Sequence, residues 1–382
     1  MKKKKIDIGK KSLKAHKKLG GKIATASKVT LKSLSDWSTY YTPGVGAVST
    51  HLAKHPHDAS VYTIKKNTVA VISDGSAVLG LGNIGPYGAL PVMEGKAAIF
   101  KEVANVDAVP IVLDTHDQEK IIETIVHIAP AFGGINLEDI ASPQCFYIEE
   151  ELKKQLSIPV MHDDQHGTAI VVLAALTNAL RVVKKKKETV SIVILGAGAA
   201  GSAVAKLLAL AGFKDLCVVD REGALCSSTA ELPLHKKILA MLPSTKSHLK
   251  TLEEVMVGAD VFIGISSANA ITQKMVKSMA PHSIVFALAN PTPEIMPDLA
   301  KRAGAKVVAT GRSDFPNQVN NALVFPGVFR GALDHHVTQI TDEMKLRAAY
   351  ALARMVKKPH AEHIIPSVLN PQVVKAIAKA IK

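Results

Sequence analysis

A glycine-rich turn between a strand and a helix constrains the fold of this chain more than any other feature. Residues 189–195 form a β-branched run that predicts a strand, and an apolar helical pattern extends from the turn to about residue 211. Between them Gly196, Gly198 and Gly201 stand at the spacing GxGxxG. A second predicted strand, residues 216–219, ends at Asp220, nineteen residues after Gly201. This order is typical of the βαβ unit that binds a dinucleotide.

Each position of the turn has a physical role in such a unit. Gly196 permits the tight turn, Gly198 lets the backbone approach a pyrophosphate, and Gly201 allows the helix to pack close to the strand. Ala199 and Ala200 begin the helix, whose free amides and dipole favour a phosphate. A tight turn that binds no ligand is the competing interpretation, and the strand and helix on either side make it the weaker one.

Asp220 bears on which dinucleotide is bound. Its carboxylate is placed to accept hydrogen bonds from the adenosine ribose, which favours NAD because a 2′-phosphate would be repelled. Arg221 follows directly, and a guanidinium there could accept that phosphate, so NADP remains an alternative.

The rest of the chain fits an α/β fold. From about residue 69 short β-branched runs alternate with helical patterns, which predicts largely parallel sheets. A length of 382 residues favours two or three domains, and we place a boundary near residue 160, with an N-terminal α/β domain over 1–160 and a Rossmann-like domain with C-terminal helices over 161–382. The expected strands are 69–73, 109–113, 135–137, 159–161, 189–195, 216–219, 261–265, 284–288 and 307–309, and the expected helices include 93–104, 118–128, 168–183, 342–356 and 371–381, the last with Asn370 as its N-cap and Pro371 at its first position.

Two acidic pairs stand at the ends of predicted strands. Glu138-Asp139 follows residues 135–137, and Asp163-Asp164 follows residues 159–161 in a predicted turn before a helix. Neighbouring carboxylates repel each other, and oxygen ligands at strand ends suit Mg²⁺ or Mn²⁺. Helix capping is the alternative for both pairs. His162 and His166 have a zinc-like spacing, but no glutamate follows His162 as in the metalloprotease motif.

Composition excludes several other classes. The net charge is +14, of which residues 1–36 supply +10 through twelve lysines against Asp7 and Asp36, so we read this segment as a solvated, partly helical leader. An aromatic content of 4% argues against a nucleic-acid stacking surface. The most apolar stretch, residues 190–213, is interrupted by glycines and a lysine, and no signal-peptide core follows the first lysines. Three cysteines form no CxxC pair. These features predict a cytoplasmic protein with no membrane partner.

Several motifs taken together resemble those of malic enzymes, and the chain is similar to the short prokaryotic type from about residue 20 to its C-terminus. The motifs that carry this resemblance are Tyr40-Tyr41-Thr42-Pro43-Gly44-Val45-Gly46, Ser73-Asp74-Gly75-Ser76-Ala77-Val78-Leu79-Gly80-Leu81-Gly82, Glu94-Gly95-Lys96, Glu138-Asp139, Asp163-Asp164 and Ala289-Asn290-Pro291-Thr292.

The resemblance implies a reaction and a metal site. Malic enzymes oxidise L-malate at C2 with NAD or NADP, release CO₂ and protonate the resulting enol to give pyruvate. The implied ligands of Mg²⁺ or Mn²⁺ are Glu138, Asp139 and Asp164. The resemblance also implies a homodimer.

Further residues take their expected roles from the same resemblance. Lys96 would remove the C2 hydroxyl proton, with its pKa depressed by burial and the cation, and Tyr41 would protonate C3 of the enol. Asp163 would orient Lys96, while Asn290 and Asn320 would contact the substrate or the nicotinamide ribose.

One departure from the pattern and three rivals stay open at this point. Longer malic enzymes carry an arginine where this chain has Ala77, so the groups that bind the substrate carboxylates are not defined by the motif. A malolactic-type enzyme shares the motifs but releases lactate, and an amino-acid dehydrogenase would need no metal. A non-catalytic nucleotide-responsive or nucleic-acid-binding protein is the remaining class.

Overall fold

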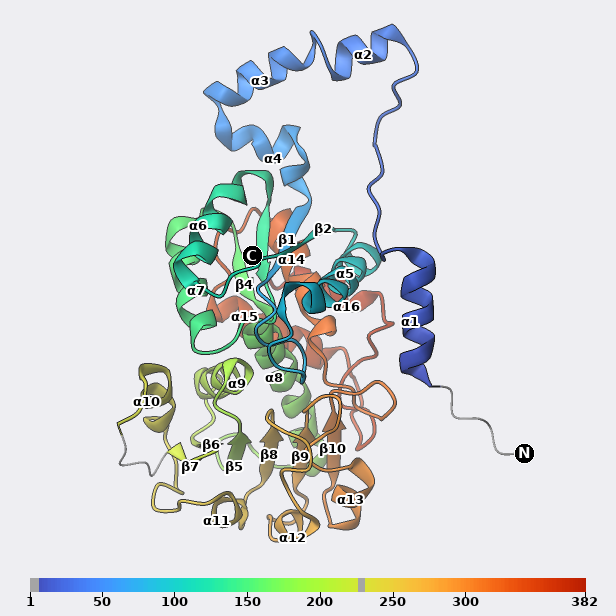
Figure 1. Ribbon diagram of the computed structural model, residues 1–382. Helices are drawn as coiled ribbons and strands as arrows, with labels where there is room; N and C mark the ends of the chain where they lie inside the picture. The colour runs from blue at the N-terminus through green and yellow to red at the C-terminus, as the bar shows by residue number, and fades with distance from the viewer. Residues whose placement is uncertain (1–6, 226–230) are drawn as a thin grey trace, which may run out of the picture.

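The structure is a computed structural model that describes residues 7–225 and 231–382 (Figure 1). Its first sheet has the strand order β2-β1-β3-β4, and all of its pairs are parallel. The four strands are β1 (Thr68–Ser73), β2 (Asp107–Val112), β3 (Gly134–Leu137) and β4 (Val160–His162). The β-branched runs of the N-terminal half therefore form a parallel sheet, as the sequence predicts.

The second sheet has the order β10-β9-β8-β5-β6-β7. Only β6 and β7 pair antiparallel. Its strands are β5 (Ser191–Leu195), β6 (Asp215–Asp220), β7 (Gly223–Ala224), β8 (Val261–Gly264), β9 (Ile284–Ala287) and β10 (Val307–Thr310). The chain crosses outward in both directions from β5, so the strand order reverses beside it, where dinucleotides bind in sheets of this kind. The Rossmann-like arrangement is confirmed.

A long central helix, α8 (Asp163–Val183), joins the two sheets. By length and composition α8 could cross a membrane, but 67% of its apolar window is buried inside the protein. It packs against α9 (Ala199–Leu210), which follows the glycine turn, and against α15 (Asp342–Arg354). In Figure 1 it lies between the upper and lower halves of the molecule, so it is a core helix.

The remaining helices cover the sheets and return the chain to its first half. Phe325 and Phe329 of α14 (Phe325–Asp334) pack against Phe100 of α5 (Gly85–Ala104) in tilted and edge-on arrangements, with ring centroids 4.7 and 5.6 Å apart. The segment after β10 therefore packs on the N-terminal half. The other covering helices are α6 (Gln118–Ile128), α7 (Gln144–Gln155), α10 (Leu234–Ala240), α11 (Leu252–Met256), α12 (Gln273–Lys277), α13 (Pro297–Arg302) and α16 (Gln372–Ala378).

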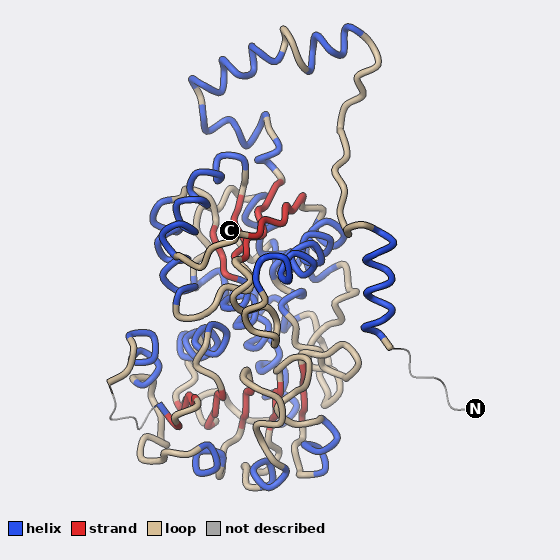
Figure 2. Tube along the Cα trace, in the orientation of Figure 1, coloured by secondary structure: helices blue, strands red, loops and turns tan. Residues whose placement is uncertain are grey.

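The N-terminal segment forms an arm that extends from the rest of the molecule (Figures 1 and 2). It consists of α1 (Ile8–Leu19), α2 (Leu34–Tyr40), α3 (Val45–Lys54) and α4 (Ala59–Tyr62). None of the described residues 7–67 is buried. The arm thus has no core of its own, and its helices need another surface to cover their apolar side chains.

Several predicted element boundaries are wrong. Helix α8 begins at Asp163 rather than at residue 168, so the second acidic pair lies in its first turn and not in a preceding turn. Helix α5 begins at Gly85 rather than at residue 93, and it tolerates Pro91 in its first two turns. Helix α16 begins at Gln372, one residue later than expected, although Asn370 still accepts a hydrogen bond from its first amide at 3.0 Å.

Candidate functional site

A cavity of about 530 Å³ lies between the two halves of the molecule. Its walls come from the β1–α5 loop, α5, the ends of β3 and β4, and the loops that follow β8, β9 and β10. The two halves nearly touch here, because a Cβ at Gly80 would lie 1.9 Å from the carbonyl oxygen of Asn290. The expected site residues that line it are Lys96, Glu138, Asp139, Asp164, Ala200, Asn290 and Asn320.

Three carboxylates meet on one wall of this cavity. Glu138 and Asp139 directly follow β3, and Asp164 lies in the first turn of α8, just after β4. Because β3 and β4 are parallel neighbours, their carboxyl ends coincide at one edge of the sheet. One ligand oxygen from each of the three carboxylates lies within 4.8 Å of the others. The three ligands that the family resemblance implies therefore lie close enough together to hold one metal ion.

The hydrogen bonds of the cluster leave oxygens free for a cation. Oδ2 of Asp164 accepts from the amide of Asp139 at 2.8 Å, and Oδ1 of Asp139 accepts from the amide of Leu79 at 3.3 Å. Oε2 of Glu138 accepts from Asn136 at 3.1 Å. Oδ2 of Asp139 is buried and has no hydrogen-bond partner among the described residues. A buried, unpartnered carboxylate oxygen next to two more carboxylates fits a hard divalent cation.

The electrostatics of the cluster support the same conclusion. Burial raises the pKa of Asp139 to about 7, and the charge of Asp164 adds to the shift. Burial also raises the pKa of Glu138 well above its ordinary value. Burial opposes the ionisation of Asp164 as well, but the contact with His162 holds its pKa below the ordinary value. Protein groups alone do not balance these charges, and a divalent cation would.

Lys96 reaches the cluster from α5. Its Nζ lies 2.5 Å from Oδ2 of Asp163, forms a second ion pair with Glu138 and stands 4.5 Å from the ring centroid of Phe325. Burial by itself would lower the pKa of Lys96, but Asp163 and Glu138 together raise it. Without a cation the protein groups thus raise the pKa of Lys96, because two carboxylates in contact with the ammonium outweigh its burial. The depressed pKa, which includes the charge of a bound cation, stays a prediction.

Tyr41 lies elsewhere. It ends α2 on the N-terminal arm, its side chain is 59% exposed, and it is not among the residues that line the cavity. The structure therefore brings together the expected base and the expected metal ligands within one chain but does not bring the expected acid to them.

The glycine turn has the shape that a dinucleotide needs. Gly196 has φ +120°, and a Cβ at Gly201 would lie 1.9 Å from the carbonyl oxygen of Gly196, so neither position tolerates a side chain. A Cβ at Gly198 would meet only Oγ of Ser142, at 3.8 Å. The protein itself leaves space at Gly198, where a pyrophosphate would approach the backbone. The amides that open α9 at Ala199 face the same region.

Asp220 ends β6 as expected, and it has a basic partner that the sequence did not indicate. Its Oδ2 lies 2.6 Å from Nζ of Lys236 on α10, and its Oδ1 accepts from the amide of Glu222 at 2.8 Å. The carboxylate that would exclude a 2′-phosphate is thus paired with a cation that could bind one.

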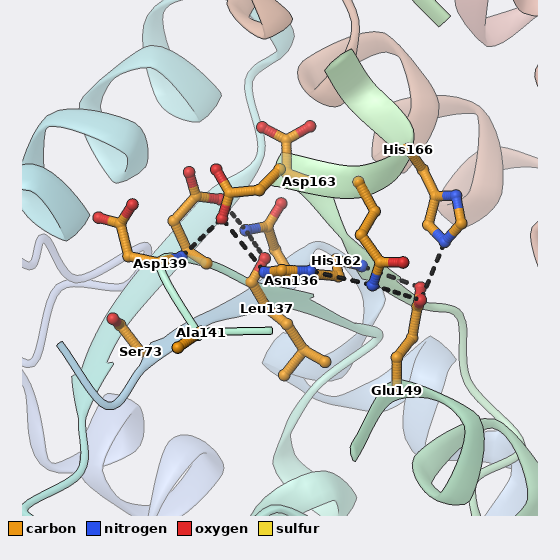
Figure 3. A network of polar contacts seen from close by, with 12 residues as sticks. Ser73, Asn136, Leu137, Asp139, Ala141, Glu149, His162, Asp163 and His166 are labelled. Carbon is orange, nitrogen blue, oxygen red and sulfur yellow. Dashed lines mark hydrogen bonds and ion pairs between the residues drawn. The ribbon is translucent and has the colours of Figure 1, made fainter. Parts of the chain in front are cut away.

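A buried network behind the carboxylate cluster was missed at the sequence level (Figure 3). Glu149 of α7, His162 at the end of β4, and Gln165 and His166 of α8 are joined by hydrogen bonds. Glu149 stands in a run of three glutamates that reads as an exposed face. Glu149 lies four residues after Cys145 and three before Leu152, which are both buried. This helical spacing was the signal in the sequence that Glu149 faces the interior.

Comparison with known proteins identifies the family. Residues 20–122 match the family model of the malic enzyme N-terminal domain, and residues 165–382 match that of the malic enzyme NAD binding domain. The chain is 54% identical to the NAD-dependent malic enzyme of Geobacillus stearothermophilus, over 95% of this chain and 76% of that protein. It is 49% identical to the bifunctional malic/malolactic enzyme of Bacillus subtilis, over 98% and 92%. The crystal structure of the NAD-dependent malic enzyme of Thermotoga maritima superposes with a TM-score of 0.94 at 48% identity, over 97% of this chain and 98% of that one. The chain therefore belongs to the malic enzyme family.

Proposed function

We propose that the protein oxidises L-malate and decarboxylates it to pyruvate and CO₂, with reduction of NAD or NADP and with Mg²⁺ or Mn²⁺ as the required cation. The observation that carries this proposal is the convergence on one cavity of a buried lysine, a carboxylate cluster and Ala200 of the dinucleotide turn. Hydride transfer and loss of CO₂ need these three elements side by side.

The metal ligands in this proposal are Glu138, Asp139 and Asp164, each with one oxygen held by a protein donor and each with one oxygen within 4.8 Å of an oxygen of the other two. When bound, the cation would supply Lewis-acid stabilisation of negative charge on the substrate oxygen, and the nicotinamide would supply a hydride acceptor.

Lys96 is the proposed base for the C2 hydroxyl proton. Asp163 and Glu138 hold its Nζ against the cluster, and Phe325 covers it, so the ammonium group has one position. A base must be neutral when it acts, and Glu138 stabilises the charged form of Lys96 less once its own charge is shared with a cation. Asp163 thus orients the base while Glu138 couples it to the metal site.

Asn290 and Asn320 are proposed to bind the substrate and the nicotinamide ribose from the opposite wall. Oδ1 of Asn320 accepts from the amide of Ala322 at 2.8 Å, which leaves its amide group free to donate. Since Ala77 supplies no charge, these amides and the backbone around Gly80 are the candidates for binding the substrate carboxylates.

The glycine turn and Asp220 support NAD as the preferred cofactor, with the pyrophosphate on Gly196, Gly198 and Gly201 and the amides of Ala199 and Ala200. The Asp220–Lys236 ion pair keeps NADP as the alternative. Initial rates with each nucleotide at equal concentration test this preference.

We also propose that the active unit is a homodimer in which Tyr41 enters the cavity of the other subunit. The arm that carries Tyr41 has no buried residue and exposes a set of large apolar side chains that a second copy would cover. These side chains are Leu31, Leu34, Trp37, Tyr40, Tyr41, Val48, Val61 and Tyr62. A tyrosine that protonates C3 must reach the substrate, and within one chain Tyr41 does not line the cavity.

Mixed dimers test this arrangement. Tyr41→Phe and Lys96→Ala subunits carry different affinity tags, and only the heterodimer is purified. If Tyr41 of each subunit enters the cavity of the other, the heterodimer should keep about half of wild-type turnover. One of its two sites then has both an intact Lys96 and an intact Tyr41, and the other site has neither. Turnover as low as that of either mutant homodimer would show that Tyr41 acts within its own chain.

The reaction itself is tested by incubating the purified protein with L-malate, NAD or NADP, and Mn²⁺ or Mg²⁺. Pyruvate and reduced nucleotide should form in equal amounts, and chelator should abolish both. Lactate without accumulated NADH would instead identify the malolactic reaction, which the name of the Bacillus subtilis relative makes the second candidate.

We further propose a cytoplasmic location, and a domain boundary near residue 160, where α8 leaves the first sheet.

A further inference from the structure

The buried network on α7, β4 and α8 begins at Glu149. This side chain is 4% exposed, and its carboxylate accepts from the amide of His162 at 3.0 Å, from Gln165 at 3.2 Å and from His166 at 2.9 Å. Lys153 adds an ion pair at 2.8 Å. A carboxylate with four donors at these distances is fixed in one orientation and stays charged.

Gln165 transmits this orientation to His162. Its Nε2 donates one hydrogen to Oε2 of Glu149 and lies 3.0 Å from Nδ1 of His162. Because Glu149 accepts one amide hydrogen, the other is directed at Nδ1, which must then be the acceptor. Nε2 therefore carries a proton, in the neutral tautomer that this contact selects as well as in the charged ring.

The protonated nitrogen of His162 faces a metal ligand of the proposed site. Nε2 lies 3.1 Å from Oδ2 of Asp164, a close ion-pair contact rather than an aligned hydrogen bond among the described residues, and the His162 ring is fully buried. The Cys145 thiol also interacts with this ring, but a carboxylate is the stronger acceptor. Oδ2 of Asp164 already accepts from the amide of Asp139 at 2.8 Å. The Asp139 amide and the contact with the His162 ring both lie on Oδ2, which leaves Oδ1 as the oxygen that is free to bind a cation.

We propose that Glu149, Gln165 and His162 are positioning residues that hold Asp164 with Oδ1 directed at the cation site. The inference rests on the metal site of the proposed function but not on the identity of the reaction. Outer partners that orient metal ligands typically change metal affinity by about 10- to 100-fold when removed. A role in packing alone would lower stability without singling out the metal.

The first test compares two substitutions that each remove one donor from Oε2 of Glu149. Gln165→Met also removes the contact with His162, whereas His166→Leu does not touch that ring. Binding of Mn²⁺ is measured by electron paramagnetic resonance of the free ion, and NAD binding by calorimetry. The expected result is a Kd for Mn²⁺ raised by about 10-fold or more in Gln165→Met and by less than about 2-fold in His166→Leu, with NAD binding unchanged in both. Equal Mn²⁺ affinity in the two variants would overturn the proposal.

The second test replaces His162. A glutamine can place an amide donor near the position of Nε2, whereas a leucine cannot, so His162→Gln should retain more Mn²⁺ affinity than His162→Leu. In malate turnover, Gln165→Met should raise the metal concentration for half-maximal rate and recover most of kcat at saturating Mn²⁺. If His162→Leu does not fold, His162→Gln and Gln165→Met still test the proposal. Mn²⁺ affinity equal to that of the wild type in both variants would refute the positioning role. If the wild-type protein binds Mn²⁺ at this site but does not convert malate, the proposed function is refuted. The expected order of Mn²⁺ affinities among the variants would still hold.

Discussion

Replacement of Asp139 by asparagine should stabilise the protein while removing its metal site. Asp139 has φ +54°, a left-handed conformation that asparagine adopts more readily than most residues. The amide oxygen can still accept from Leu79, and the new NH₂ group can donate to the neighbouring Asp164. The substitution therefore removes a buried charge with little change of shape.

The magnitude follows from the pKa of Asp139. Burial and the charge of Asp164 raise it from 3.8 to about 7 in the folded protein. The folded form thus holds a proton that the unfolded chain has lost, and stability falls as the pH rises from about 4 to 7. A shift of about three units corresponds to an upper bound of about 4 kcal/mol above pH 7. An asparagine side chain does not titrate, so Asp139→Asn should recover up to this amount at pH 8 and nothing near pH 4.

Urea unfolding in EDTA at pH 4 and pH 8 measures this difference, and Asp114→Asn, which changes an exposed carboxylate, is the matched control. Saturating Mn²⁺ should make the wild type more stable to unfolding than Asp139→Asn, because only the wild type gains binding energy from the cation. A variant less stable than wild type in EDTA at pH 8 would refute the electrostatic reasoning, and so would equal stabilisation of both proteins by Mn²⁺.

Three further outcomes are expected. Lys96→Ala should abolish malate oxidation and oxaloacetate decarboxylation together while NAD binding measured by fluorescence persists; retained turnover would place the base elsewhere. Protons should compete with Mn²⁺ at Asp139, so the Kd for Mn²⁺ should rise about tenfold per pH unit below 7 and level off above it, and a pH-independent Kd would contradict this. Gly198→Ala should fold normally but bind NAD weakly, whereas Gly201→Ala, whose Cβ would collide with Gly196, should lower Tm as well; equal Tm values for the two variants would argue against this packing.

The part of the site that the sequence predicted follows from strand ends and turn chemistry. The glycine turn could be read directly, since φ +120° at Gly196 and the close approach at Gly201 leave no other residue type. The carboxylate cluster could be anticipated because parallel strands deliver their carboxyl ends to one edge.

The remainder depended on tertiary contacts that no local pattern encodes. The raised pKa of Lys96 results from contact with Asp163, sixty-seven residues away in the chain. Glu149 stands in a run of three glutamates, and only the register of α7 places it on the buried face. The exposed position of Tyr41 could not be foreseen either, because a helix of seven residues gives no indication of which surface will cover it.

The most direct test is a crystal structure of the protein grown with NAD and Mn²⁺, with the metal located by its anomalous scattering. The expected result is one strong peak about 2–2.5 Å from carboxylate oxygens of Glu138, Asp139 and Asp164, in the same cavity as the nicotinamide ring. A peak at His162 and His166, or a nicotinamide bound away from the carboxylate cluster, would contradict the assignment of this cavity as the site of malate oxidation.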